Sequence, residues 1–501
     1  MPPDKIVAEL GFVRLDQRRK PPLFRQLYDQ IRTAILDGRL STTTRIPSSR
    51  DLVEQLNVSR TTVVTAIDLL ISEGYLQTEV GRGTFVSGNI PNDHPFVHST
   101  LPGSRHPKPK NMTQAAPYLS ERGMQFDLDK PDFGYANTIK PFQPGVPALD
   151  QFPMGVWSKI VRRVWSEMSA DHLSYGEPTG YFPLRESVAE YLRAHRGVRC
   201  TAEQVMVVGG TQQATDLVSR LLIDPGDLVL FENPGYVNSR EAIEKNGGKI
   251  VPLPVGRDGV QIHEATRNCR KARLAYVTPS HQYPLGITMT IERRMELIDW
   301  AGKTGSFLVE DDYDSEYRYA QQPIPSMQGL DSSQQTIYIG SFSKVVFPAL
   351  GMGYLVVPPR LVSAFEKALS VVSRPTSFID QVILNEFIRE GHFIRHLRRM
   401  RKTHSERLQV FHNAVQKHMA SRVELLGGKA GLHCAALLKG KKADRLAAKA
   451  LDQVGVVANP LSSYYLKQST TKKQLNGLVF GFACATPSQL RKAVRKSAAV
   501  I

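Results

Sequence analysis

One lysine of the sequence stands where it could form a covalent bond to a carbonyl compound. Lys344 follows the apolar run TIYIG in the segment Ser341-Phe342-Ser343-Lys344, so two hydroxyl groups flank its amine at the end of an expected strand. A lysine amine becomes a good nucleophile when a desolvated pocket lowers its pKa. The hydroxyls of Ser341 and Ser343 are suitable donors to a phosphate group. The segment therefore predicts a Schiff-base lysine beside a phosphate site.

A carboxylate and a phenol follow another expected strand and could hold an aromatic ring. Asp311 comes directly after the run SFLVE. Its charge would keep a pyridine nitrogen protonated, which strengthens the ring as an electron sink. Tyr313 could donate a hydrogen bond to the ring's phenolate oxygen and lower the pKa of an imine. The alternative interpretation is an exposed acidic cluster, which Asp311 would form with Glu310, Asp312 and Asp314.

A glycine pair and a second aromatic residue complete the requirements of a pyridoxal phosphate (PLP) site. The run VVGGTQQA places Gly210, Thr211 and Gln212 at a strand-to-helix junction, where free N–H groups and the helix dipole favour a phosphate. Tyr236 in ENPGY follows the next strand, as a ring-stacking side chain would. Glycine pairs are common in turns and buried tyrosines are common in cores, so these features become specific only in combination.

These residues lie at the ends of short apolar runs that alternate with helical stretches. The strand candidates are VMVVGG, LVLFENP, LAYVTPS, SFLVEDD and TIYIGSFSK, and the helical stretches include QQATDLVSRLL and ERRMELIDWAGK. Such alternation predicts a layered α/β domain. Six prolines between Asn89 and Pro117 indicate an extended connector. We therefore predict a Pro-rich linker at 89–118 and a large domain at 119–501.

The segment before this linker has the pattern of a helix-turn-helix followed by a β-hairpin wing. Apolar residues recur at helical spacing from Leu23 to Leu40, and two shorter periodic stretches, DLVEQLN and TTVVTAIDLLISEG, follow. YLQTEVGRGTFVSG then combines β-favouring residues with glycines. The second short helix would open with Ser59 and Arg60, at the end that enters the major groove in helix-turn-helix docking. We predict a DNA-binding domain at 1–88.

Composition sets limits without choosing a function. The chain has 501 residues, 41% of them hydrophobic, and Lys and Arg outnumber Asp and Glu by 64 to 47. This excess favours polyanionic partners. The excess of positive charge is spread along the chain, because residues 1–120 hold 15 basic and 11 acidic side chains and residues 121–501 hold 49 basic and 36 acidic ones.

The four cysteines form no Cys-x-x-Cys pair, and no apolar run reaches about 18 residues. We expect a cytoplasmic, unanchored protein without a disulfide or metal site.

The motif order over residues 20–88 resembles the GntR family of winged helix-turn-helix regulators. The motifs are P-S-S-R-D-L, N-V-S-R-T-T-V, E-G-Y-L and G-R-G-T-F-V. The resemblance implies binding to double-stranded operator DNA. It also implies DNA contacts from Arg45, Ser48, Ser49, Arg50, Ser59, Arg60, Thr61, Thr62, Arg82 and Thr84.

The remainder resembles fold-type-I aminotransferases, and the whole chain resembles MocR-type GntR regulators. YGEPTGYFPLR, GGTQQA, ENPGY, TPSHQYPLG, EDDYDSEYRY and SFSK occur in the order of that family. The resemblance implies a mixed sheet flanked by helices, a small C-terminal α+β subdomain, and a domain-swapped, head-to-tail homodimer. It implies PLP as cofactor, with Lys344 forming the Schiff base. The other implied PLP contacts are Asp311 at the pyridine nitrogen, Tyr313 at the ring oxygen, Tyr236 on the ring face, and Gly210, Thr211, Gln212, Ser341 and Ser343 at the phosphate.

Three positions depart from the family pattern. Family members carry an arginine seven residues beyond the lysine, and this chain has Gly351 there, so a guanidinium that would pair with the phosphate is missing. Tyr283, a further expected cofactor contact, stands where many aminotransferases have Asn. This change is common in the regulators and favours sensing over catalysis. Asn238 follows Tyr236 where some relatives use a cation, and the last strand candidate, GLVFGFA, has no arginine. These absences predict an effector without an α-carboxylate.

The sequence therefore predicts a transcription regulator that senses a small amine, an amino acid or PLP itself. An active aminotransferase carrying a DNA-binding arm is one alternative, and a large domain that serves only for dimerisation is another. The basic stretch at 392–407 is interpreted as a solvated surface helix, with an accessory DNA contact as the alternative.

Overall fold

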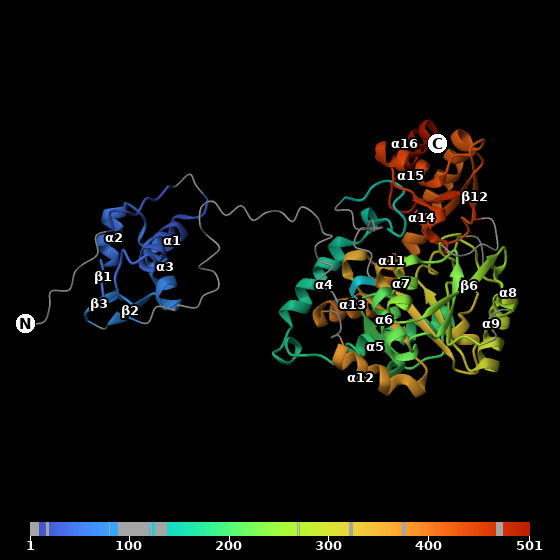
Figure 1. Cartoon of the computed structure of the whole chain (residues 1–501), viewed down its shortest axis with the longest axis horizontal. Coiled ribbons are helices and arrows are strands. Elements are labelled where there is room, and N and C mark those ends of the chain that lie inside the picture. The colour runs from blue at the N-terminus through green and yellow to red at the C-terminus, as the bar shows by residue number, and fades with distance from the viewer. Residues whose placement is uncertain are drawn as a thin grey trace, which may run out of the picture. The chain divides into compact units, whose positions relative to one another are not determined.

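The computed structural model contains two compact units, Met1–Gln114 and Ala115–Ile501 (Figure 1). The structure describes residues 10–16, 20–79, 81–88, 120, 123–125, 138–267, 269, 271–319, 324–372, 377–466 and 474–501. The predicted linker at 89–118 lies outside the described residues.

In its described residues, the first unit contains three helices and a small sheet. Its elements are α1 (Leu23–Leu36), β1 (Arg45–Ile46), α2 (Ser49–Leu56), α3 (Arg60–Ser72), β2 (Leu76–Glu79) and β3 (Gly83–Val86). The antiparallel strands are ordered β1-β3-β2, and β2 and β3 form the predicted hairpin. β1 was not predicted, because two residues are too few to produce a periodic pattern.

Local capping fixes the helix pair of this unit. Ser48 and Asp51 form a capping box at the start of α2, and Asn57 ends that helix in the left-handed conformation (φ 49°). The Ser59 hydroxyl then accepts a hydrogen bond from the Thr62 N–H and starts α3. Such caps satisfy N–H groups that would otherwise lack partners. The tight turn at Asn57 follows from these signals.

The second unit is built on an eight-stranded sheet of order β4-β11-β10-β9-β8-β5-β6-β7. Pairing is parallel except at β11 and β7. The strands are β4 (Val205–Val208), β5 (Leu228–Asn233), β6 (Lys249–Gly256), β7 (Gly259–Val260), β8 (Leu274–Val277), β9 (Phe307–Asp312), β10 (Thr336–Ser341) and β11 (Gly353–Val356).

Helices cover both faces of this sheet. They are α4 (Met154–Ser166), α5 (Phe182–Arg196), α6 (Thr211–Leu222), α7 (Val237–Lys245), α8 (Ile262–Thr266), α9 (Ile291–Thr304), α10 (Met327–Leu330), α11 (Phe342–Val345), α12 (Val362–Val372) and α13 (Phe378–Arg389). Successive residues of β9 enter different cores: Leu308 packs in the cluster that contains Leu297 of α9, and Val309 packs in the cluster that contains Leu217 of α6. This burial on both faces explains the uninterrupted apolar runs of the central strands.

A smaller α+β part follows, with an antiparallel sheet of order β12-β13-β15-β14. Its elements are α14 (His392–Met419), β12 (Val423–Leu426), β13 (His433–Leu438), α15 (Asp444–Gln453), β14 (Asn459–Pro460), β15 (Gly477–Gly481) and α16 (Pro487–Val500). We call residues 392–501 the C-terminal subdomain. Figure 1 shows α14, α15 and α16 together at one end of the second unit, with α12 at the other end.

The basic stretch at 392–407 forms the first half of α14 and is only partly solvated. Arg395 and Arg398 are exposed, whereas Phe393, Leu397 and Met400 on the opposite face are buried. The interpretation as a solvated surface helix therefore holds for one face only, because the opposite face packs in the apolar cluster that also contains Phe342 of α11. Within the described part of the chain, no helix is both long and apolar enough to span a membrane.

Candidate cofactor site and DNA-binding surface

Parallel strands bring the predicted cofactor residues to one edge of the large sheet. Asp311 on β9 pairs with Ile339 on β10, and Ser341 at the end of β10 pairs with Gly353 on β11. Gly353 in turn pairs with Val208, after which β4 leads into α6. The carboxyl ends of β4, β9 and β10 therefore lie side by side, where ligands bind in open α/β sheets.

Lys344 lies in the one-turn helix α11 that follows β10. Its Nζ donates a hydrogen bond to the carbonyl oxygen of Gly145 at 2.9 Å. Burial lowers the pKa of the Lys344 amine, although Asp314 and Asp311 oppose this effect. A lowered amine pKa raises the fraction of nucleophilic neutral lysine.

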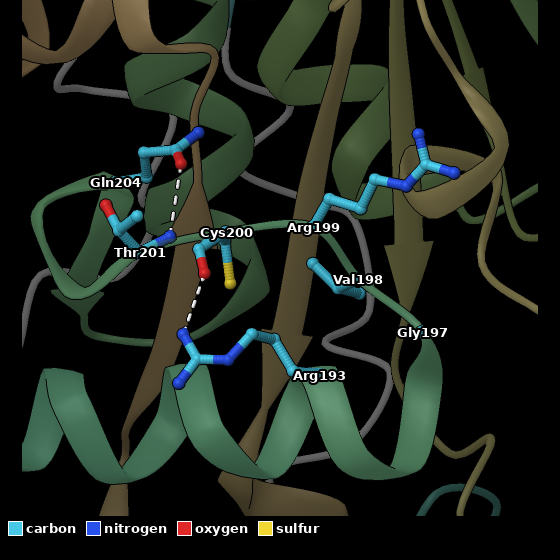
Figure 2. Close-up of a pocket in the computed structure, with 7 residues that line it drawn as sticks. All are labelled: Arg193, Gly197, Val198, Arg199, Cys200, Thr201 and Gln204. Carbon is cyan, nitrogen blue, oxygen red and sulfur yellow. Dashed lines mark hydrogen bonds between the residues drawn. The ribbon is translucent and has the colours of Figure 1, made fainter.

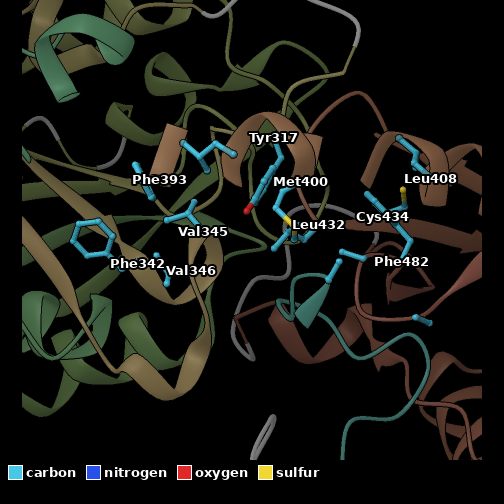
Figure 3. Close-up of a cluster of buried hydrophobic side chains, with 14 of the residues drawn as sticks. Tyr317, Phe342, Val345, Val346, Phe393, Met400, Leu408, Leu432, Cys434 and Phe482 are labelled. Carbon is cyan, nitrogen blue, oxygen red and sulfur yellow. The ribbon is translucent and has the colours of Figure 1, made fainter. Parts of the chain in front are cut away.

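Packing on both sides fixes the position of this lysine. Phe342 and Val345 are buried in the large apolar cluster that also contains Met400 and Leu432 (Figure 3). The hydroxyl of Tyr317, from the same cluster, donates to the main-chain oxygen of Lys344 at 3.0 Å. The cluster thus joins the lysine segment to the C-terminal subdomain.

Asp311 offers an unpartnered acceptor for a ring nitrogen. Its Oδ2 accepts a hydrogen bond from the Tyr276 hydroxyl at 2.5 Å, and its buried Oδ1 has no hydrogen-bond partner. Burial raises the pKa of this carboxyl to about 7. A protonated pyridine nitrogen would supply the missing donor and stabilise the carboxylate, so this position fits PLP.

The other members of the predicted acidic cluster are buried and have different roles. Asp312 forms an ion pair with Arg196 at 2.7 Å, and the Glu310 oxygens accept the N–H groups of Met327 and Gln328. The exposed-cluster interpretation is therefore wrong, because each of these carboxylates is enclosed by the sheet and its helices.

Gly210 and the start of α6 lie at the strand-to-helix junction where the phosphate site is predicted. Gly210 is the N-cap of α6 with a φ of 99°, which favours glycine, and an added Cβ would meet no atom within 4 Å. Thr211 and Gln212 follow as the first helical residues. Gly351 also has open space around a built Cβ, and the Gly353 backbone packs against Gly210. A phosphate at this helix start would meet N–H groups and the positive end of the helix dipole.

One of the two serines near Lys344 caps the short helix α11. The Ser341 hydroxyl accepts a hydrogen bond from the N–H of Ser343 at 3.3 Å and so caps α11. Both side chains remain at the edge where β10 ends, next to the lysine turn.

Aromatic side chains form a wall of the site. The Tyr236 and Tyr283 rings meet edge to face at 5.5 Å between centroids, and Tyr283 meets Tyr313 similarly at 6.0 Å. The Tyr313 hydroxyl donates to the main-chain oxygen of His281 at 2.7 Å. Tyr464 of the C-terminal subdomain shares a hydrogen bond of 3.0 Å with the Tyr283 hydroxyl. The predicted ring contacts Tyr236, Tyr283 and Tyr313 therefore lie together.

Sequence reasoning missed a buried group of His281, Asp314 and His433. The three offer metal-ligand atoms within 4.8 Å of one another, and His281 Nδ1 lies 3.1 Å from both Asp314 oxygens. Burial lowers the pKa of His433 well below its usual range, so this side chain is neutral, and its Nε2 has no hydrogen-bond partner. His433 comes from β13, and no local pattern could have connected it with the other two.

Arg240 is a second residue that sequence reasoning missed. It lies one helical turn beyond Tyr236 and donates to the main-chain oxygen of Tyr464 at 3.5 Å. Burial lowers the pKa of its guanidinium. Its spacing of four residues from Tyr236 was the available signal.

The predicted DNA-contacting residues lie on β1, at the start of α2, at the start of α3 and on the hairpin of β2 and β3. Most of them are exposed: Arg45, Ser48, Arg50, Ser59, Arg60, Thr61 and Arg82. Ser49, Thr62 and Thr84 are partly buried. The Arg45 guanidinium lies over Gly83, where an added Cβ would come within 3.0 Å of its Nε, and Arg82 pairs with Glu79 at 3.1 Å. The Ser48 and Ser59 hydroxyls already cap helices, so their first role is structural.

A pocket elsewhere in the second unit does not belong to either site. It lies at the end of α5 and in the following loop, where Arg193 donates to the main-chain oxygen of Cys200 (Figure 2). Burial raises the pKa of the Cys200 thiol to about 11, which leaves the thiol protonated and unreactive.

Comparisons with known proteins match the two units of the chain to two different families. Residues 23–86 match the family "Bacterial regulatory proteins, gntR family", and residues 148–496 match "Aminotransferase class I and II". The probable rhizopine catabolism regulatory protein MocR of Rhizobium meliloti is 38% identical over 96% of this chain and 94% of its own length. The pyridoxine biosynthesis regulator PdxR of Corynebacterium glutamicum is 30% identical over 93% of this chain.

A solved structure supports the match of the second unit to the aminotransferases. The α-aminoadipate aminotransferase LysN of Thermus thermophilus, complexed with N-(5'-phosphopyridoxyl)-L-leucine, superposes with a TM-score of 0.66 at 26% identity and covers 72% of this chain and 92% of its own. Fold and site thus define a DNA-binding regulator whose larger unit is a fold-type-I aminotransferase domain with PLP as cofactor. The chain belongs to the MocR-type regulators of the GntR family.

Proposed function

We propose that the second unit senses a small amine, an amino acid or PLP itself through Lys344, and that its state controls how the winged domain binds DNA. The observation that carries the proposal is the combination, at one sheet edge, of a lysine with a lowered pKa and a buried carboxylate with one unpartnered oxygen. PLP, when bound, supplies an aldehyde that condenses with amines and a ring that withdraws electrons.

The chain's own residues have separate roles in this proposal. Lys344 supplies the amine, Asp311 holds a proton at the ring nitrogen, and Tyr313 places a hydroxyl at the ring oxygen. Tyr236 and Tyr283 provide aromatic contact surface, and the start of α6, with Ser341 and Ser343, provides phosphate donors. The ten residues of the winged domain named above contact operator DNA.

Switching requires an effector with different affinities for two arrangements of the protein. Tyr464 and His433 come from the C-terminal subdomain, whereas Tyr283 and Tyr313 come from loops of the large sheet. An effector in contact with both sets would favour one relative position of the two parts. We further propose that the regulator acts as a domain-swapped, head-to-tail homodimer in the cytoplasm.

The proposal for the effector's chemistry has three versions. The absence of an arginine from β15 supports an amine without an α-carboxylate. Arg240, near Tyr464, is the guanidinium that could instead receive a carboxylate. The pyridoxine biosynthesis regulator among the relatives supports the version in which PLP is the effector.

The test is a PLP titration of the full chain, followed by visible absorption. We expect a PLP-dependent absorption band in the parent and in the control Lys303→Ala, whose lysine is exposed on α9, and no such band in Lys344→Ala. Amines are then screened for a change in affinity for DNA selected from a random pool. Absence of the band at saturating PLP would make the second unit a dimerisation scaffold. Steady conversion of an amino donor and a keto acid, without an effect on DNA binding, would support the aminotransferase alternative.

A further inference from the structure

The positive charge of the second unit is concentrated near its end. Residues 417–501 contain fifteen Lys and Arg against three Asp and Glu, and so carry most of the chain's net charge of +17. Twelve of these cations lie in the described part, and all twelve are exposed: Lys417, Arg422, Lys429, Lys439, Lys441, Lys442, Arg445, Lys449, Arg491, Lys492, Arg495 and Lys496. We call this set the C-terminal basic surface.

The few acidic residues of this segment do not neutralise it. Asp444 is buried and accepts hydrogen bonds from the N–H and hydroxyl of Ser462, and Asp452 pairs with Lys140 at 2.8 Å. Glu424 is exposed on β12 and is the third acidic residue of the segment. Among the described residues, no cation of the C-terminal basic surface has a carboxylate oxygen within ion-pair distance. A solvated protein surface normally mixes both signs, so a field of one sign indicates a charged partner.

Helix α16 forms one part of this surface. Leu490, Ala493 and Val494 face the core, while Arg491, Lys492, Arg495 and Lys496 form a stripe on the exposed face. Arg491 and Arg495, and likewise Lys492 and Lys496, are like charges four residues apart, a spacing that destabilises a helix. The helix contains no acidic residue to offset this repulsion.

Side-chain contacts connect this stripe with its neighbours. The Lys442 Nζ donates to the main-chain oxygen of Val500 at 2.6 Å, and Arg422 donates to that of Ala498, so both cations lie at the C-terminal end of α16. Lys496 Nζ donates to the main-chain oxygen of Val454, just beyond α15. Cations are thus gathered where the helix dipole is negative, and they continue the stripe toward α15.

We propose that the C-terminal basic surface is a second DNA-binding site, which contacts the phosphate backbone without reading sequence. Exposed lysine and arginine side chains suit phosphate oxygens, and the chain already belongs to a family of DNA-binding proteins. This inference goes beyond the effector proposal and does not depend on it.

The test compares salt-dependent binding of full-length variants to a linear mixed-sequence duplex. The α16 variant is Arg491→Gln/Lys492→Gln/Arg495→Gln, whose three side chains are exposed. The matched control, Lys271→Gln/Lys303→Gln/Lys367→Gln, removes the same charge from exposed positions on other elements, including α9 and α12 (Figure 1). Each variant is also made with the winged domain weakened by substitutions at its exposed arginines.

Each phosphate contact contributes about 0.9 to the slope of log affinity against log salt. We therefore expect the α16 variant to lower that slope by about 2 to 3, with the winged domain intact or weakened. Its melting temperature should not fall, because the substitutions relieve like-charge repulsion along α16. The control should keep the parent slope. Equal slopes for the α16 variant and the control would overturn the proposal. So would loss of binding to phosphatidylserine vesicles with an unchanged DNA slope, because that result would assign the surface to membranes.

Discussion

Gly351→Arg should increase the affinity for PLP. Gly351 precedes β11, whose first residue, Gly353, packs against Gly210, and a Cβ added at Gly351 meets no atom within 4 Å. A guanidinium there could reach a phosphate held, as we propose, at the start of α6. A hydrogen bond to a charged group contributes about 1.5–3 kcal/mol. The dissociation constant should therefore fall by about 10- to 150-fold.

The same substitution should lower the stability of the domain. Gly351 has a φ of 56°, in the left-handed region. A side chain in that conformation costs roughly 1–2 kcal/mol. This strain is present with and without PLP, so it cancels in the binding equilibrium and appears only as a lower melting temperature of the PLP-free protein.

Two controls separate charge from strain. Gly351→Ala has the strain alone, and Gly351→Gln adds a polar side chain without charge. PLP affinity is measured by absorption titration, and stability by thermal denaturation of the PLP-free forms. If the arginine variant binds PLP no more tightly than the glutamine variant, the phosphate lies elsewhere and the reasoning from Gly351 fails.

Three further outcomes are expected. Ser59→Ala should destabilise the winged domain by about 1 kcal/mol through loss of the α3 cap, which thermal melting would show. Ser59→Asp should keep the cap but weaken DNA binding, because its carboxylate repels the DNA phosphates, and a DNA titration would show this. Burial lowers the pKa of His404 to about 3, so the folded protein disfavours protonation of this side chain below its usual pKa of about 6.5. The free energy of unfolding should therefore decrease as pH drops below about 6.5, by roughly 2 kcal/mol at pH 5. In His404→Gln, the melting temperature should depend less on pH in this range. Tyr276→Phe removes the hydrogen bond that lowers the pKa of Asp311, so PLP affinity should fall about tenfold in the absorption titration. An unchanged PLP affinity would contradict the proposed role of Asp311.

The cofactor residues could be predicted because each lies at or shortly after the end of a strand whose pattern is local. Asp311 lies at the end of β9, and Lys344 and Gly210 come two to three residues after β10 and β4. Parallel pairing brings such strand ends to one edge. The comparisons confirm the family, the fold and the cofactor, while the individual PLP and DNA contacts stay predictions.

His433 and Tyr464 could not be predicted in the same way. They enter the site from β13 and from the 3-10 helix Leu461–Tyr464 that follows β14, more than a hundred residues beyond Tyr313. Their positions depend on how α14 packs against the large sheet, which is a tertiary property without a sequence period. The partial burial of α14 was also missed. Arginines on both sides of this helix make its apolar stripe hard to recognise in the sequence.

The C-terminal subdomain connects the two proposals through its own residues. It contributes His433 and Tyr464 to the cofactor edge, and it carries the C-terminal basic surface on α15, α16 and their flanking segments. If an effector favours one position of this subdomain against the large sheet, the same movement displaces the cations of that surface. Coupling between binding sites is reciprocal in free energy. DNA held by the basic surface would therefore change effector affinity by the same factor by which the effector changes DNA affinity.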